Sequence, residues 1–304
     1  MKERAMGHRV SLVDMCLGVA VALIWGMGIL FAKAAIGQFP PILLMSFRFM
    51  VTALALVWFV PIPRGQLGRI FWIAFVSAAV QYSLTFTGLK GLDASITVLV
   101  VQLEVPFLVL IGALALKEQP GLRKWIGIAT AFAGVALIAG QPQVASAWPS
   151  VLMVIGGAFT WAIGQGMVRQ LSDINGVTTT AWVAVMAAPQ LLVMSLIFES
   201  GHVEAIRAAA PIVWIAVAYL GLVMTAIGYG MWYSLVRRNP VSQVAPFLLL
   251  LPVFGVAGGY VFLGENLGPW ALLGGAIVIA GVAFILIERP AFTQARDQSK
   301  NPDA

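Results

Sequence analysis

The chain consists of long apolar runs separated by short polar or glycine- and proline-rich breaks. Most runs approach the ~20 residues that a helix needs to cross a bilayer, and the alternating strands of roughly ten residues found in membrane β-barrels are not seen. The first run is longer than the core of a signal peptide, about 7–15 residues, so we interpret it as a retained helix. The pattern predicts ten transmembrane helices, at residues 12–34, 40–60, 67–88, 92–116, 122–140, 149–169, 177–198, 211–235, 241–263 and 269–287.

The composition agrees with a lipid environment. Hydrophobic residues make up 61% of the chain and charged residues only 10%, whereas roughly a quarter of the residues of a soluble domain are charged. The single cysteine, Cys16, excludes an internal disulfide. The fold class predicted is therefore an all-α integral membrane protein that contacts membrane lipid directly.

The basic residues are distributed unevenly between the two sides of the predicted bundle. Ten spans place both chain ends on one side, and this side carries 14 of the 18 lysine and arginine residues. The other side carries Lys33, Lys90 and Arg207, while Arg48 lies inside a span. By the positive-inside rule we expect a multi-pass protein of the bacterial inner membrane with cytoplasmic N- and C-termini. This topology accounts for the net charge of +6, so no nucleic-acid partner is expected.

The second half of the chain repeats the first. Trp72-Ile73-Ala74 recurs as Trp214-Ile215-Ala216, and Trp25 corresponds to Trp161. Seven further residues recur at one offset without a gap: Glu118, Gly127, Ala133, Gly134, Val135, Ala136 and Ile138 are matched by Glu265, Gly274, Ala280, Gly281, Val282, Ala283 and Ile285. The chain is therefore predicted to contain a duplicated unit.

Each copy contains five spans, and an odd number reverses the orientation of the second copy in the membrane. The sequence thus predicts two inverted five-helix repeats with a site between them near the bilayer midplane, the usual plan of a secondary transporter. The predicted organisation is a cytoplasmic N-terminus at 1–11, a first repeat at 12–140, a linker at 141–148, a second repeat at 149–287 and a cytoplasmic tail at 288–304.

Several residues also carry a family resemblance. They are Arg48 with Phe49 and Ala53, Pro106 before Glu118, Pro252 before Glu265, and the two helices that end with Gly134-Val135 and Gly281-Val282. Together they resemble the doubled EamA-type unit of the drug/metabolite transporter superfamily, most closely the bacterial aromatic amino-acid exporter group. The resemblance covers nearly the whole chain and implies a ten-helix exporter of small metabolites, often amino acids. In one departure, Glu104 precedes Pro106 by two residues, whereas Leu250 holds the matching position in the second half.

Arg48 and Glu104 are the clear ionisable residues within the predicted spans. Each requires an explanation, because a charge at a helix centre costs about 2.5–3.5 kcal/mol on insertion scales. Glu104 could face a wet cavity, where it would bind a substrate ammonium group or carry a coupling proton. Alternatively, it could form a buried pair with Arg48 that joins the second and fourth helices. The sequence leaves both interpretations open.

Trp25 and Trp161 lie half way along the first and sixth helices, away from the interfaces where tryptophan is usually found. They could form an aromatic wall for a zwitterionic solute, or simply pack within the bundle. Gln165 follows Trp161 by four residues and so shares its helix face. Other polar residues within spans extend this set, although interhelical hydrogen bonding is an alternative role for them. The predicted substrate lining is Trp25, Tyr82, Gln102, Glu104, Trp161, Gln165 and Tyr229.

Pro106 and Pro252 lie inside the fourth and ninth spans, where the missing N–H donor of proline produces a kink. Equivalent kinks are natural bending points for alternating access, so we expect these prolines to act in gating, with static shaping of the bundle as the alternative. Glu118 and Glu265 follow the same spans. We expect each to cap the N-terminus of the next helix and not to bind substrate.

The chain does not have the residues of a typical enzyme site. Its histidines, His8 and His202, lie outside the spans, no phosphate-binding or zinc-protease signature occurs, and no metal or cofactor is expected. We predict a secondary active or facilitative transporter that exports amino acids, including aromatic or other apolar ones, or similar small metabolites, by alternating access, driven by the solute gradient or by protons. The alternatives are a lipid or nucleotide-sugar carrier and a membrane-embedded lipid-processing enzyme or scaffold.

Overall fold

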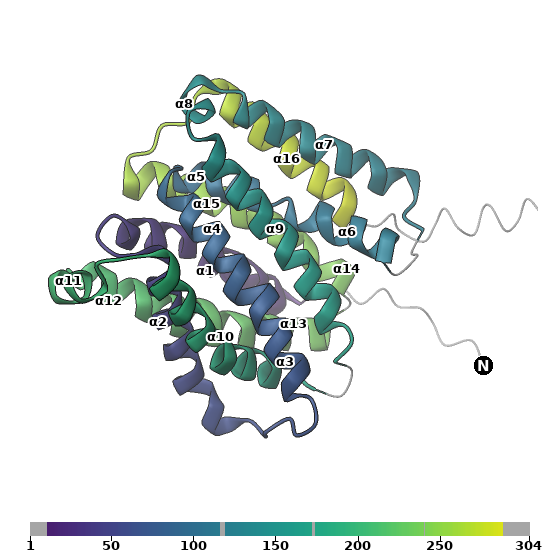
Figure 1. The fold of residues 1–304 in the computed structure, drawn as a ribbon. Helices are drawn as coiled ribbons and strands as arrows, with labels where there is room; N and C mark the ends of the chain where they lie inside the picture. The colour runs from purple at the N-terminus through teal and green to yellow at the C-terminus, as the bar shows by residue number, and fades with distance from the viewer. Residues whose placement is uncertain (1–10, 116–118, 172–173, 240, 288–304) are drawn as a thin grey trace, which may run out of the picture.

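The computed structural model describes residues 11–115, 119–171, 174–239 and 241–287, and every regular element in these ranges is helical (Figure 1). Ten segments are long and apolar enough to cross a membrane. Their bounds lie within a few residues of the predicted ones, so the ten-helix prediction is confirmed. The spans are Leu12–Ile36, Pro41–Phe59, Leu67–Lys90, Ala94–Leu114, Leu122–Ala139, Trp148–Val168, Gly176–Phe198, Pro211–Arg238, Ala245–Leu263 and Pro269–Leu286.

Five of the ten spans are single helices, and the other five are made of two or three elements each. In the first half, the elements are α1 (Leu12–Ile36), α2 (Pro41–Leu56) with the 3₁₀ turn η1 (Val57–Phe59), α3 (Leu67–Ala74), the π-helix η2 (Phe75–Val80), α4 (Gln81–Lys90), α5 (Ala94–Val101), α6 (Glu104–Ala115) and α7 (Leu122–Ala139). The loop helix α8 (Pro142–Ala145) leads to the second half. There the elements are α9 (Trp148–Val168), α10 (Gly176–Phe198), α11 (His202–Ala208), α12 (Pro211–Ala218), the π-helix η3 (Tyr219–Ile227), α13 (Gly228–Arg238), α14 (Val241–Val244), the 3₁₀ segment η4 (Ala245–Leu249), α15 (Leu250–Leu263) and α16 (Pro269–Leu286).

The contact between α7 and α16 demonstrates how the two halves are related. These helices run side by side (Figure 1), and their glycines let the backbones approach closely. A Cβ atom on Gly127 would lie 2.7 Å from the carbonyl oxygen of Gly281, and one on Gly134 would lie 2.7 Å from that of Gly274. The repeat matches Gly127 to Gly274 and Gly134 to Gly281, so each contact is the symmetry equivalent of the other. The halves are therefore inverted about a pseudo-twofold axis, as predicted.

The third, fourth, eighth and ninth spans are irregular at equivalent places. The third and eighth contain the π-helices η2 and η3, a feature that often marks functional sites. The fourth span breaks at Gln102–Leu103, between α5 and α6, and the ninth passes through η4 before α15 begins. Pro106 and Pro252 are each the third residue of the helix that follows the break. An N–H there has no partner within the helix, so these prolines belong to a helix start and not to the predicted kink within a continuous helix.

Carboxylates connect the halves at the side of the bundle opposite the chain ends, here called the far side. Glu265 accepts hydrogen bonds from the backbone nitrogens of Ala94 (2.6 Å) and Ser95 (2.9 Å), at the start of α5. The prediction that Glu265 caps a helix is confirmed, but the helix is α5 and not the next one, α16. Gly264 ends α15 in a left-handed conformation with φ +67°, which glycine adopts readily. The next residue is Glu265, whose carboxylate reaches α5 in the other half of the chain. Glu118, for which we predicted the same role, lies outside the described residues.

Other charged groups on the far side act in a similar way. Glu199 accepts hydrogen bonds from the backbone nitrogens of Ile42 (2.9 Å) and Leu43 (3.0 Å), at the start of α2. Lys33 donates to the carbonyl oxygen of Leu89 (3.0 Å), in the last turn of α4, and to that of Leu92 (2.5 Å), in the loop that follows. These contacts satisfy backbone groups that helix ends leave without partners. They hold the far-side ends of different spans against one another.

A further carboxyl group, that of Asp93, adjoins this far-side region. Burial raises the pKa of Asp93, which lies between the third and fourth spans, above its ordinary value. The nearby Glu265 carboxylate raises this pKa further, whereas the Lys33 ammonium group opposes the change. Asp93 is the N-cap residue of α5, but its side chain makes no capping hydrogen bond. Glu265 takes that role instead.

Candidate functional site

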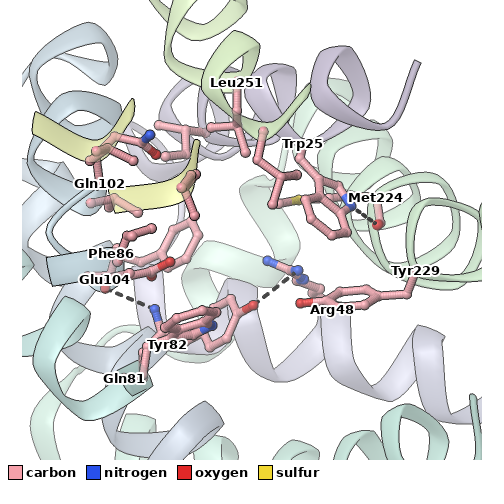
Figure 2. Close-up of a pocket in the computed structure, with 18 residues that line it drawn as sticks. Trp25, Arg48, Gln81, Tyr82, Phe86, Gln102, Glu104, Met224, Tyr229 and Leu251 are labelled. Atoms are coloured by element: carbon pink, nitrogen blue, oxygen red, sulfur yellow. Dashed lines mark hydrogen bonds between the residues drawn. The ribbon is translucent and has the colours of Figure 1, made fainter. Parts of the chain in front are cut away.

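A cavity of ≈ 200 Å³ lies in the middle of the bundle, between the two halves (Figure 2). Trp25, Arg48 and Glu104 lie near the midpoints of their spans, so the cavity is at the level of the predicted midplane site. The first half supplies residues of α1, α2, α4, α5 and α6, and the second half supplies residues of α9, η3, α13, η4, α15 and α16. Six of the seven residues predicted to contact substrate line it, namely Trp25, Tyr82, Gln102, Glu104, Trp161 and Tyr229.

The seventh predicted residue, Gln165, lines a neighbouring cavity of ≈ 110 Å³. The two cavities share three wall residues, Tyr82, Trp161 and Tyr229. The second cavity also borders Val168 at the end of α9, and thus lies toward the side of the bundle where the chain ends are found. The sequence prediction brought together residues that do lie together, although whether they bind a substrate stays a prediction.

The aromatic residues at the cavity are held by their neighbours. The indole nitrogen of Trp25 donates to the carbonyl oxygen of Met224 at 3.1 Å, which fixes the ring against the eighth span (Figure 2). A Cβ atom on Gly228 would lie 2.5 Å from the same nitrogen, so only glycine leaves room for the indole. The Trp25 and Tyr229 ring centroids are 5.0 Å apart, and Tyr82 stacks on Phe86 at 5.5 Å. The cavity therefore has rigid aromatic walls.

The predicted alternative of a buried pair between Glu104 and Arg48 is wrong. No ion pair or hydrogen bond joins them, and Glu104 makes none with any other side chain in the described ranges. Glu104 is the first residue of α6, directly after the break in the fourth span, and it is partly exposed to the cavity. Arg48 bonds instead to Thr225 and Tyr82. The break in the fourth span places Glu104 at the cavity, where it does not reach Arg48.

Several polar groups at the cavities are left without a described partner. The side chains of Gln102, Gln165 and Tyr229 make no hydrogen bond within the part of the chain that the structure describes. Polar groups in a membrane interior usually find partners, because an unsatisfied one is costly. Groups that are free and face a cavity are therefore suited to contact a polar solute.

Sequence reasoning missed some cavity residues. Arg48 was noticed as an intramembrane charge, but only as a partner for Glu104, and Gln81 was noticed as a polar residue within a span but left out of the predicted lining. Thr85, Phe86 and Met224 were missed altogether. Phe86 lies one helical turn after Tyr82 on α4 and shares its face, a spacing that would have identified it. Met224 lies within η3, and the sequence carries no clear signal for that π-helix.

The site shows no sign of a metal centre. Within the described residues, no group of three or more His, Cys, Asp or Glu side chains could hold a metal ion. The cavity walls contribute one carboxyl group, Glu104, and no histidine. The arrangement can enclose a small solute and offer it charged and aromatic contacts.

Comparisons with known proteins agree with this architecture. The chain is 28% identical over 285 residues to the "Probable amino-acid metabolite efflux pump" of Salmonella typhimurium (strain LT2), with 90% of this chain and 94% of that protein covered. It is 26% identical over 283 residues to the protein of the same name in Escherichia coli (strain K12), with the same coverage. The "Uncharacterized transporter YvbV" of Bacillus subtilis (strain 168) is 27% identical over 278 residues, covering 87% of this chain and 88% of that protein.

A solved structure is similar in fold, with a TM-score of 0.62 at 18% sequence identity, covering 90% of this chain and 96% of the other. The EamA-like transporter family matches two stretches, residues 13–140 and 148–287, which together make up most of the chain. The two matched stretches contain the two inverted halves described above. This chain is a member of the EamA-like transporter family, a multi-pass membrane transporter and not an enzyme.

Proposed function

We propose that this transporter exports amino acids, including aromatic or other apolar ones, or similar small metabolites. The observation that supports it best is the mid-membrane cavity of ≈ 200 Å³, which combines aromatic walls with a carboxyl group, Glu104, that has no partner among the described residues. An amino acid presents an ammonium group to such a carboxylate and an apolar side chain to such walls. The names of the Salmonella and Escherichia relatives point to the same class of solute.

The size of the cavity favours a small solute over the alternative cargoes. Pockets for drug-sized ligands typically measure about 300–1,000 Å³, and the cavity at ≈ 200 Å³ is smaller. A lipid or a nucleotide sugar would need more space. A nucleotide sugar would also call for several cations near its phosphates, whereas Arg48 is the one cation in the cavity lining.

The transport mechanism that we propose is alternating access. The two inverted halves would open the cavity to one side of the membrane and then to the other, with Trp25, Tyr82, Gln102, Glu104, Trp161, Gln165 and Tyr229 as the substrate lining. Pro106 and Pro252 start the helix segments that follow the two equivalent breaks, which makes them candidates for gating. The driving force is the solute gradient or an exchanged proton, for which Glu104 is the candidate carrier.

We further propose that the chain lies in the bacterial inner membrane with both termini in the cytoplasm. The excess of basic residues on that side supports this orientation. Single cysteines introduced at Arg64 and Arg237 should be labelled from the cytoplasmic side, and a cysteine at Lys90 from the opposite side, in a Cys16→Ser background. Labelling of Arg64 and Arg237 positions from opposite sides would contradict the proposed topology.

Uptake into reconstituted liposomes tests the proposed function. A panel of labelled amino acids should include some that enter protein-containing liposomes faster than empty ones, with and without a pH gradient. Glu104→Gln should lower this uptake, whereas Glu204→Gln, at an exposed carboxylate of α11, should leave it unchanged. If no member of the panel moves although the protein stays folded, the proposed substrate class is wrong. A response to the pH gradient that Glu104→Gln removes would support proton coupling.

A further inference from the structure

Arg48 is a fully buried cation that has no carboxylate partner in the described residues. Its side chain is 1% exposed and lines the central cavity. The Nε and Nη2 groups donate to the Thr225 hydroxyl at 3.3 Å and 3.1 Å, and Nη2 also donates to the Tyr82 hydroxyl at 3.3 Å. Among the described residues, the one hydrogen-bond acceptor near Nη1 is the sulfur of Met45, at 4.0 Å. Part of the guanidinium donor capacity is therefore unused.

The surroundings of Arg48 orient the guanidinium group without neutralising it. Its Cζ atom lies 4.7 Å from the Tyr82 ring centroid and 5.4 Å from that of Phe49. Aromatic faces attract a cation, but they carry no net charge. Two hydroxyl groups could be bridged by a neutral amide, without the cost of placing a charge inside the membrane. A structural tie alone thus gives no reason for an arginine at this position, whereas an anionic ligand does.

The opposite side of the cavity carries free acceptors. Glu104 has no ion-pair or hydrogen-bond partner in the described ranges, and it lies across the cavity from Arg48 (Figure 2). Gln81, at 4% exposure, lines the same cavity. Its amide nitrogen donates to Thr85 at 3.1 Å, while its carbonyl oxygen is buried with no hydrogen-bond partner. A cationic group would satisfy both acceptors.

Arg48 and Glu104 line the same cavity but do not pair. Tyr229, from the second half, lines the cavity with them. The two charged side chains are thus in the same small space, on separate walls. A ligand with a carboxylate at one end and an ammonium group at the other would compensate both, and a ligand with only one of these groups would leave the other charge buried and unpaired.

We infer that the cavity reads the two ends of a zwitterion separately, with Arg48 binding the α-carboxylate and Glu104, assisted by the Gln81 carbonyl oxygen, binding the α-ammonium group. This inference rests on the proposed function and narrows it to amino acids with both ends free. The substrate side chain then faces the aromatic wall, where the Trp25 indole is already bonded to Met224 and offers a ring face and no donor. Amides, esters and N-acyl derivatives are rejected.

Competition in reconstituted liposomes tests this selectivity. The transported probe is labelled L-phenylalanine, and the competitors are unlabelled L-phenylalanine, L-phenylalaninamide, which lacks the carboxylate, and N-acetyl-L-phenylalanine, which lacks the ammonium group. We expect each blocked derivative to compete at least about tenfold more weakly than the free amino acid, because a site built for polar contacts discriminates strongly against ligands that cannot make them. Equal competition by all three would overturn the inference and leave the proposed function intact.

Two substitutions test which residue binds the ammonium group and which binds the carboxylate. Glu104→Gln should weaken binding of L-phenylalanine and reduce the preference for it over N-acetyl-L-phenylalanine, while the preference over L-phenylalaninamide remains. Arg48→Gln should have the reverse effect on the two preferences. The control is Glu204→Gln, which should keep both preferences. If Glu104→Gln lowers affinity for all three compounds by the same factor, Glu104 does not recognise the ammonium group and the assignment is wrong.

Arg48→Gln could fail to fold, because its side chain connects three spans, and the test does not depend on it. Arg48→Lys keeps the charge and should fold with the preference over L-phenylalaninamide reduced but present, since an ammonium group makes fewer oriented contacts with a carboxylate. Thermal stabilisation of the purified wild-type protein gives a second measure, and L-phenylalanine should raise the Tm more than either derivative. If no amino acid is transported at all, the proposed function itself fails, which separates that outcome from a loss of selectivity.

Discussion

Two helix interfaces border the central cavity at equivalent places, yet they are built differently. One joins α1 of the first half to η3 and α13 of the second, and is here called the bonded interface. The other joins α9 of the second half to η2 and α4 of the first, and is called the glycine interface. The pseudo-twofold axis exchanges the two. Although the two halves are copies of one unit, their equivalent interfaces are therefore held by different kinds of contact.

Directional hydrogen bonds run along the bonded interface. At the end near the chain termini, Asp14 pairs with Arg238 at 3.0 Å and accepts a hydrogen bond from Asn239 at 3.1 Å. Near the middle, Trp25 donates to the Met224 carbonyl oxygen, and the Tyr219 hydroxyl donates to that of Ile24 at 2.9 Å. These contacts are spread over most of α1, so the two spans are held in one register.

The glycine interface is held by close packing. A Cβ atom on Gly88 would lie 2.6 Å from the carbonyl oxygen of Ser150, and Gly157 and Gly164 lie against Thr85 and Ser77 in the same way. No hydrogen bond joins the two spans within the described residues. Close contact without directional bonds restricts separation but opposes sliding less. We therefore expect motion between the halves to occur mainly at the glycine interface, while the bonded interface moves as a unit.

Widening the glycine interface should have the largest effect. A Cβ atom on Gly164 would lie 2.9 Å from the Cα atom of Ser77, a backbone atom that cannot easily move away. Gly164→Val should lower the free energy of unfolding by about 1–3 kcal/mol through overpacking and abolish transport. Thermal unfolding in detergent and uptake into liposomes measure the two effects.

Gly166 provides a matched control on the same helix. The nearest atom to a Cβ placed there belongs to Ile111, at 3.8 Å, so Gly166→Val should change stability by no more than about 0.5 kcal/mol. Equal behaviour of the two variants would show that close approach at Gly164 is not needed. Loss of transport in Gly164→Val with unchanged stability would support the sliding role most directly.

Breaking the bonded interface at its end should have a smaller effect. Asp14→Ala removes the partner of Arg238 and one acceptor of Asn239, a buried residue at 8% exposure. We expect the Tm to fall by several degrees and the transport rate to fall moderately, because the hydrogen bonds of Trp25 and Tyr219 near the middle of the interface remain. Arg237→Ala is the control, since Arg237 is exposed and makes no hydrogen bond or ion pair with the residues that the structure describes. A Tm unchanged by Asp14→Ala would mean that this tie does not hold the interface.

Much of the fold could be predicted from the sequence. Hydrophobic length identified all ten spans, and the Gly127 and Gly134 repeat at Gly274 and Gly281 identified the inverted duplication, because lipid imposes strict requirements on length and backbone pairing. The same repeat did not predict how the interfaces differ. Asp14 and Arg238 lie 224 positions apart in the numbering and show no pattern that links them.

The sequence predicted most of the residues that lie at the candidate site, but not how they are oriented there. Polar and aromatic residues in mid-span were correctly expected to lie together, since the cavity is where a membrane bundle can accommodate them. The orientation of Glu104 could not be predicted, because it depends on the break at Gln102–Leu103, and the π-helix that places Thr225 beside Arg48 depends on tertiary packing. The prediction that Glu265 caps α16 was wrong because the choice of α5 also depends on tertiary packing.

The prolines at the two helix breaks provide a second contrast between the halves. Pro106 follows a break lined by polar residues, and Pro252 follows one lined by leucines. In both Pro106→Ala and Pro252→Ala the new N–H group can bond to a residue before the break and favour a continuous helix. We expect stability to change by less than about 1 kcal/mol, and transport rates to fall a few-fold, more for Pro106→Ala because Gln102 and Glu104 would be reoriented. Unchanged initial rates in liposomes would exclude a gating role for both prolines.

The smallest expected effect comes from a single bond in the middle of the bonded interface. Tyr219→Phe removes the hydroxyl that donates to Ile24 but keeps the ring, whose centroid lies 4.0 Å from that of Phe31. Interhelical hydrogen bonds in membranes contribute about 0.6 kcal/mol on average, so the loss of unfolding free energy should be near that value. Tyr260→Phe, at a residue that is 65% exposed, should cost less.

Combined with Asp14→Ala, Tyr219→Phe should lower stability by more than the sum of the two single effects if the ties act together in holding one register. Simple additivity would mean that each tie acts alone, and the distinction between the two interfaces would then rest on the glycines.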